Sequence, residues 1–106
     1  MKITTKSTNL DLTPALNEYL EMKIGSLSKY LEKYEKEGVV EARVELARTT
    51  NHHYKGDVFM AEADIRLPGK ILRADAETED IRSAIDLLEN KLTKQIEKYK
   101  DKAAEY

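Results

Sequence analysis

The chain has 106 residues, of which 41% are hydrophobic and 36% are charged, and its formal net charge is −2. This length predicts one small domain, residues 1–106, with a single core. The absence of cysteine excludes disulfides and thiolate catalysis and is typical of a cytoplasmic protein. No apolar segment is long enough for a signal peptide or a membrane span, so we expect no membrane partner.

The N-terminal part of the sequence predicts one strand followed by one helix. Residues 2–7 alternate in the manner of a short, half-buried strand. Thr13 and Pro14 form a typical helix start, because Thr caps free N–H groups and Pro fits the first turn. Apolar residues then recur at helical spacing to about Lys36. Gly25 lies inside this predicted helix, and we interpret it as a position of close packing rather than a break.

After this helix the apolar period changes to two, which predicts three consecutive amphipathic strands. They are centred on residues 40–46, 59–67 and 72–76, and the turn signal Pro68-Gly69 joins the second strand to the third. Each strand has one polar face, so we expect a sheet with one covered and one water-exposed face. The acids and arginines of the polar face indicate cross-strand charge pairing rather than a catalytic pair of carboxylates.

The last quarter of the chain, residues 78–102, predicts one long helix with an apolar stripe. The order of elements is then β-α-β-β-β-α, which predicts an α+β fold. We expect a two-layer sandwich in which two helices cover one face of a four-stranded sheet. The first two strands should be parallel, because a helix connects them.

Four lysines lie together on one flank of this final helix when residues are spaced at about 100°. They are Lys91, Lys94, Lys98 and Lys102. Lysines four residues apart repel each other slightly, and their acidic neighbours lie mostly on the far side of the helix. This arrangement indicates a polyanionic partner, since each lysine that meets a phosphate releases counterions. The alternative, an ordinary solvated helix face, stays open at this point.

The adjacent histidines His52 and His53 are the other candidate site, in the polar connection between two predicted strands. Neighbouring residues of a regular backbone point in different directions, and a zinc site needs three or four ligands. We therefore expect no metal site. The four glycines are isolated from one another, so no phosphate-binding loop is present. We expect neither enzyme activity nor a small-molecule substrate.

Several segments of the chain resemble, in their order and spacing, a known bacterial family. They are residues 9–16 (NLDLTPAL), Gly56 with 59–62 (FMAE), 67–69 (LPG), 72–74 (LRA), 79–86 (EDIRSAID) and 91–100 (KLTKQIEKYK). Together they resemble the ribosome hibernation promoting factor and ribosome-associated inhibitor family, also called sigma factor modulation proteins. The resemblance covers nearly the whole chain.

The resemblance implies a fold similar in shape to a double-stranded RNA-binding domain. It implies a factor that occupies the messenger and transfer RNA channel of the small ribosomal subunit and silences translation in stationary phase or stress. The contacts would be made to ribosomal RNA, with no DNA partner, no enzyme activity and no cofactor, and we expect a monomer when free. The family's RNA-binding positions correspond to the four lysines of the final helix and to Lys23 and Lys29 of the first.

The chain departs from the family pattern at two positions. Members usually have Tyr where this chain has Arg82, and often a basic residue where it has Ser26. Arg82 keeps the site polar and adds a candidate phosphate contact. The chain ends at Tyr106, so we expect it to correspond to the short form, without the C-terminal domain of long members. The alternative function is a protein-interaction module that modulates a transcription factor through the exposed sheet face.

Overall fold

The computed structural model describes residues 1–50 and 57–104. The elements are β1 (Lys2–Thr8), α1 (Pro14–Gly25), α2 (Ser28–Glu37), β2 (Glu41–Thr50), β3 (Asp57–Leu67), β4 (Lys70–Thr78) and α3 (Ile81–Ala104). The predicted order is confirmed, except that the first helix is divided in two. His52 and His53 lie outside the described residues, so the interpretation of that segment stays a prediction.

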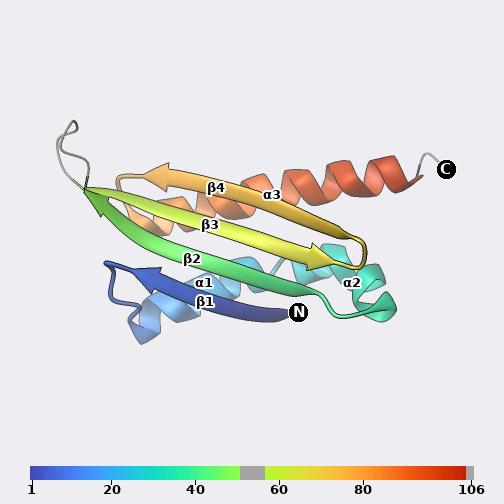
Figure 1. Cartoon of the computed structure of the whole chain (residues 1–106), viewed down its shortest axis with the longest axis horizontal. Coiled ribbons are helices and arrows are strands. Elements are labelled where there is room, and N and C mark those ends of the chain that lie inside the picture. Colours follow the sequence, from blue (N-terminus) through green and yellow to red (C-terminus); the bar gives the residue numbers. More distant parts are fainter. Residues whose placement is uncertain (51–56, 105–106) are drawn as a thin grey trace.

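The four strands form one sheet in the order β1-β2-β3-β4 (Figure 1). β1 runs parallel to β2, with Ile3 opposite Ala42, which confirms the parallel pairing expected from the intervening helical segment. β3 and β4 continue the sheet as antiparallel hairpins. β1 and β4 are therefore the two edges of the sheet.

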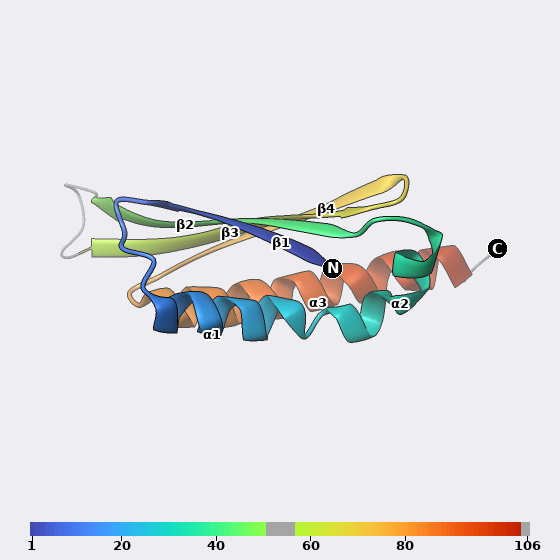
Figure 2. The ribbon, with the colours of Figure 1, turned by 90° about the horizontal axis from the view of Figure 1, so that it is seen from below.

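All the helices lie on one face of the sheet, as Figure 2 shows, and no described element covers the other face. The core fills the space between the two layers, where Ala42, Leu46 and Ile65 of the sheet are fully buried. The helices and the link between α1 and α2 supply Leu20, Ile24, Leu27, Leu31, Ile85, Leu88, Leu92 and Ile96, all with 0% exposed surface. The predicted two-layer α+β sandwich is confirmed, because each amphipathic element turns its apolar side to this common interior.

The prediction of one unbroken helix through Gly25 is wrong. α1 ends at Gly25 and α2 begins at Ser28, with Ser26 and Leu27 between them. Both linking residues keep helical φ angles, −62° and −68°, but their ψ values of −19° and −18° are those of a tighter 3₁₀ turn. The N–H of Leu27 accordingly donates to the carbonyl of Ile24, three residues back, at 3.1 Å. The apolar positions stay buried on both sides, so the helical spacing survives the break.

The interpretation of Gly25 as a close-packing position is also wrong. A Cβ atom at this residue would lie 4.0 Å from Cδ1 of Ile3, an ordinary van der Waals contact. Replacing Gly25 with alanine should therefore raise the free energy of unfolding by about 0.5–1 kcal/mol, because glycine loses more backbone entropy in a helix. Urea denaturation followed by circular dichroism would measure this gain, and a loss of stability would show that the helix break itself needs glycine.

α3 begins at Ile81, three residues later than the sequence predicts, because Thr78 still belongs to β4. Asp80 caps the helix: its carboxylate Oδ2 accepts from the N–H of Ser83 at 3.0 Å, and its carbonyl accepts from the N–H of Ala84. α3 spans 24 residues and is the longest helix. In the described part of the chain, no helix combines the length and apolarity that a bilayer crossing requires.

The exposed sheet face carries both ion pairs and a row of like charges. Nε of Arg73 on β4 lies 3.2 Å from Oδ1 of Asp64, its direct neighbour on β3, which confirms cross-strand charge pairing at this place. Glu62, by contrast, stands directly between Glu45 of β2 and Asp75 of β4. Like charges in opposite positions destabilise a sheet, so pairing accounts for only part of this face.

Candidate nucleic-acid interface

The four lysines of α3, here called the lysine flank (Lys91, Lys94, Lys98 and Lys102), are all exposed. The rotation of α3 is fixed by its apolar stripe, whose members Leu88, Leu92 and Ile96 are fully buried against the sheet. The flank therefore lies along the side of α3 that faces the β4 edge. At a rise of about 1.5 Å per residue, the flank is roughly 16 Å long from its first lysine to its last.

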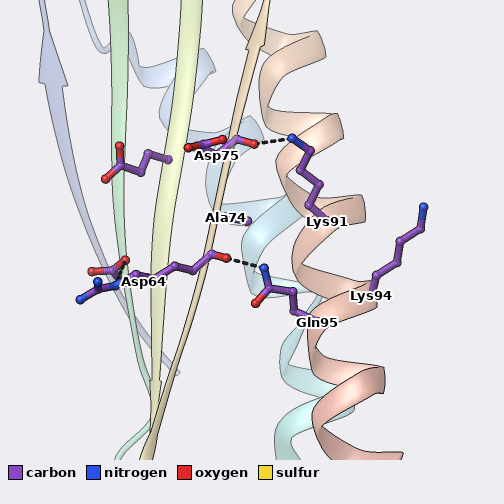
Figure 3. A pocket seen from close by; sticks show the side chains of 8 residues that line it. Asp64, Ala74, Asp75, Lys91, Lys94 and Gln95 are labelled. Atoms are coloured by element: carbon purple, nitrogen blue, oxygen red, sulfur yellow. Dashed lines mark hydrogen bonds and ion pairs between the residues drawn. The ribbon is translucent and has the colours of Figure 1, made fainter.

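Two side chains of α3 reach across to the backbone of β4, as Figure 3 shows. Nζ of Lys91 donates to the carbonyl of Asp75 at 2.7 Å, and Nε2 of Gln95 donates to the carbonyl of Arg73. These carbonyls belong to the edge strand and point away from β3, so without α3 they would have only water as partner. Lys91 is thus engaged in holding α3 to the sheet, which distinguishes it from the rest of the flank.

The other three lysines of the flank are free of ion pairs to any described residue. Lys94 extends away from β4 in Figure 3, and neither Lys98 nor Lys102 lies within ion-pair distance of a carboxylate in the described chain. Their ammonium groups are held at helical spacing on a rigid element. The arrangement can accept a row of phosphates without first breaking internal contacts.

The N-terminal end of the flank borders a hollow of mixed charge, with a volume of about 530 Å³ (Figure 3). Its lining consists of Glu62, Asp64, Arg73, Ala74, Asp75, Lys91, Lys94 and Gln95. Three carboxylates here balance three cations, and one pair of them, Arg73 with Asp64, is already in contact. The carboxylates that line this hollow therefore offset the positive charge of Lys91 and Lys94.

The structure adds Lys70, which the sequence reasoning did not single out, to the C-terminal end of the flank. Lys70 follows the Pro68-Gly69 turn and opens β4, and it lines a second hollow together with Lys98 and Lys102. A basic residue directly after a turn was the only sequence signal available. It could not show that the hairpin brings this residue beside α3.

The candidate cations Lys23 and Arg82 both lie close to the ring of Tyr19, where α1 meets α3. Nζ of Lys23 is 5.6 Å and Cζ of Arg82 is 4.7 Å from the centroid of the tyrosine ring, within cation–π range. Arg82, the departure from the family pattern, therefore serves as a contact between the two helices. Arg82 is nevertheless exposed, so its guanidinium lies against the aromatic ring and in contact with solvent.

Asp86 of α3 joins this group and compensates one of its cations. Its Oδ1 accepts from the hydroxyl of Tyr19 and lies 3.5 Å from Nζ of Lys23. The hydrogen bond to Asp86 raises the pKa of Tyr19, and the negative charge of Asp86 raises the pKa of Lys23. Ser26 is the second departure from the family pattern. Its Oγ donates to Oε2 of Glu89 on α3 at 2.9 Å.

Lys29 lies on α2, beyond the helix break, and its Nζ is 5.1 Å from the ring centroid of Tyr30. The carbonyl of Tyr30 accepts from Nζ of Lys100 on α3 at 3.2 Å. Lys29 is exposed and has no ion pair to a described residue. It remains a candidate contact, separate from the Tyr19 group.

The seven candidate cations therefore occupy two sides of α3 rather than one continuous surface. The lysine flank faces β4, whereas Asp86, Glu89 and Lys100 face α1 and α2. At about 100° per residue, the crest between these sides carries two exposed acids, Glu97 and Asp101, here called the acidic crest. A polyanion that lies on the C-terminal part of the flank must avoid this acidic crest to reach the cations of the other side.

Within residues 1–50 and 57–104, no group of three or more metal-ligating side chains is placed to hold a metal ion. The carboxylates of the sheet face lie in open, mixed-charge hollows, and one of them is already paired with Arg73. What the described geometry offers is a cationic track along α3 and a second, partly compensated cationic group where α1 and α2 meet α3.

Residues 3–104 match the family described as "Sigma 54 modulation protein / S30EA ribosomal protein". The chain is 33% identical over 102 residues to the ribosome hibernation promotion factor of Bacillus subtilis, covering 96% of this chain and 50% of that protein. It is 35% identical over 102 residues to the protein of the same name from Lactococcus lactis, covering 94% and 50%. The chain thus spans about half the length of these curated relatives.

Two solved structures have a similar fold. The N-terminal domain of Thermus thermophilus Protein Y superposes with a TM-score of 0.75 at 28% identity, covering 93% of this chain and 99% of that one. A ribosomal subunit interface protein from Coxiella burnetii gives a TM-score of 0.69 at 27% identity, covering 95% and 99%. Both cover the described sheet and helices almost entirely.

Proposed function

The chain belongs to the sigma 54 modulation protein / S30EA ribosomal protein family, and from this membership we propose that it binds the ribosome and silences translation. Its relatives are named ribosome hibernation promotion factor, and one structural neighbour is titled a ribosomal subunit interface protein. We propose further that it occupies the messenger and transfer RNA channel of the small subunit under stress or in stationary phase. It would act by occupancy, with no chemical step.

The observation that carries the proposal is the uncompensated part of the lysine flank. Lys94, Lys98 and Lys102 are exposed and unpaired in the described chain, although the protein as a whole is acidic. Phosphate contacts of this kind fix position without reading sequence, which suits folded RNA recognised by its shape. Ribosomal RNA presents such closely spaced phosphates on a rigid surface.

The cations on the other side of α3 have a different role in this proposal. Lys23 is paired with Asp86, and both Lys23 and Arg82 lie against the ring of Tyr19. The acidic crest separates them from the flank. We therefore assign the main contact to the lysine flank with Lys70, and a second, weaker contact to Lys23, Lys29 and Arg82. Two separated contacts also orient the protein in its site.

Salt dependence tests the proposal directly. Binding to purified small ribosomal subunits is expected to weaken steeply between 50 and 200 mM salt, with a log–log slope of roughly 0.7–0.9 for each lysine engaged. Sedimentation of the protein with small subunits at each salt concentration measures the slope. In starved cells, the protein should also migrate with ribosomes through a sucrose gradient.

A flat salt response would contradict the proposal and favour a protein partner. The surface for such a partner is the exposed sheet face, where Glu45, Glu62 and Asp75 stand side by side. Binding through that face would survive ribonuclease treatment of a lysate, whereas binding through the lysine flank would not. The two treatments together separate the two functions.

A further inference from the structure

A hollow of about 370 Å³ lies at the C-terminal end of the lysine flank, between α3 and the start of β4. Its lining consists of Lys70, Leu72, Gln95, Lys98, Tyr99 and Lys102. Three lysines from two different elements therefore border one depression. The hairpin turn at Pro68-Gly69 sets the position of Lys70, and the buried stripe of α3 sets the positions of the other two.

The charge of this hollow differs from that of the one beside Lys91. Among the described residues, no acid lines it, and none of its three lysines has an ion pair. The hollow beside Lys91 contains three carboxylates. Carboxylates that repel an anion therefore line the hollow beside Lys91 but not this one, whose nearest acids on α3 are those of the adjacent acidic crest.

The floor of the hollow is apolar and partly aromatic. Leu72 is 4% exposed, and the partly exposed ring of Tyr99 is braced by Tyr34, with ring centroids 5.6 Å apart and planes tilted by 42°. A braced ring offers a flat surface at low cost in side-chain entropy. The hollow thus combines a flat apolar wall with a cationic rim.

We propose that this hollow receives one unpaired nucleotide of an RNA strand, with its base against Tyr99 and Leu72 and its flanking phosphates on Lys70, Lys98 and Lys102. A nucleotide is the ligand that joins a flat aromatic group to nearby negative charges. The bases of a duplex are stacked inside it and cannot enter, so the hollow selects single-stranded segments. This inference rests on the proposed function and specifies which part of the RNA the protein holds.

Titration with short RNAs, followed by the backbone amide resonances of Lys70, Leu72 and Tyr99, tests the inference. Single-stranded hexaadenylate is expected to shift these three resonances and to bind at least about tenfold more tightly than a 12-base-pair RNA duplex. Equal binding of the duplex, or shifts confined to other resonances, would overturn it. Free ADP binding as tightly as hexaadenylate would also overturn it, because the ligand would then be a soluble nucleotide and not an RNA strand.

Two pairs of variants distinguish the contribution of base stacking to RNA binding from the contribution of charge. Tyr99→Leu should weaken hexaadenylate binding about 5- to 100-fold through the loss of base stacking, whereas Tyr99→Phe should leave it within about twofold. Lys70→Gln should lower the salt slope by about 0.7, and Lys6→Gln on the other edge of the sheet should not change it. Unchanged binding in both Tyr99→Leu and Lys70→Gln would overturn the inference.

Binding of the same variants to small ribosomal subunits keeps this inference distinct from the proposed function. If the protein binds ribosomes but hexaadenylate does not shift the resonances of the hollow, the inference about the hollow is wrong and the proposed function is unaffected. If hexaadenylate shifts these resonances but the protein does not bind ribosomes, the inference about the hollow is supported and the proposed function is wrong.

Discussion

Replacing Lys94 and Lys98 with glutamate is expected to abolish detectable co-sedimentation with small ribosomal subunits. Each lost charge-assisted contact costs about 1.5–3 kcal/mol, so two contacts correspond to at least about 100-fold in affinity before repulsion by the new carboxylates is added. Both side chains are exposed and unpaired in the described chain, so the helix content should not change. Sedimentation at 100 mM salt and far-ultraviolet circular dichroism measure the two quantities. Lys91 is left intact because it also holds the carbonyl of Asp75.

The matched control replaces Lys2 and Lys6 with glutamate. These lysines are exposed on β1, at the edge of the sheet farthest from β4, and the control has the same net charge as the test variant. Because they lie opposite Glu41 and Glu45 of β2, the new carboxylates weaken the sheet, so the control must first give a far-ultraviolet circular dichroism spectrum of the folded protein. A loss of ribosome binding in both proteins would show that overall charge, not the lysine flank, controls the interaction. If the variant with Lys94 and Lys98 replaced still binds, the lysine flank is not the ribosome-binding surface.

Replacing Leu92 with alanine should lower the free energy of unfolding by about 2–5 kcal/mol. Leu92 is 0% exposed in the middle of α3, so its loss leaves a cavity between this helix and the sheet. A small domain has a total stability of roughly 5–15 kcal/mol, so this single change would remove a large part of it. Urea denaturation monitored by circular dichroism gives the value.

Leu87→Ala on the same helix is the control for this stability effect. Leu87 is 38% exposed, so its truncation should cost well under half as much as that of Leu92. Equal losses for the two variants would mean that α3 is held by contacts other than its buried stripe. The rotation of α3, and with it the direction of the lysine flank, would then lack its physical basis.

The sequence predicts most of this fold because its elements are strongly amphipathic. In the strands, apolar residues recur every two positions, which places Ala42, Leu46 and Ile65 in the interior. In α3 they recur about every 3.6 positions, which places its apolar stripe in the interior. The break between α1 and α2 could not be predicted in this way. Ser26 and Leu27 remain helical in φ, and only a shift to three-residue hydrogen bonding divides the helix. Apolar spacing does not record such a change.

The candidate site was predictable only in part, because its electrostatics depend on contacts that are distant in sequence. The common direction of the four lysines follows from helical spacing alone. The compensation of Lys23 comes from Asp86, on a different helix, and Lys70 reaches the flank through the β3–β4 hairpin. Helical spacing within one segment cannot reveal which charges the tertiary fold adds or cancels.

The hydrogen bonds that Lys91 and Gln95 make to the β4 backbone also limit how the molecule can aggregate. Sheet-like fibres grow when a free strand docks at each end of the sheet, so growth needs two open ends. α3 blocks one of these ends at the middle of β4, and Lys2 and Lys6 place repelling charges along the other. A strand from a second copy could therefore pair only with β1. Such pairing ends at a dimer and cannot extend into a fibre.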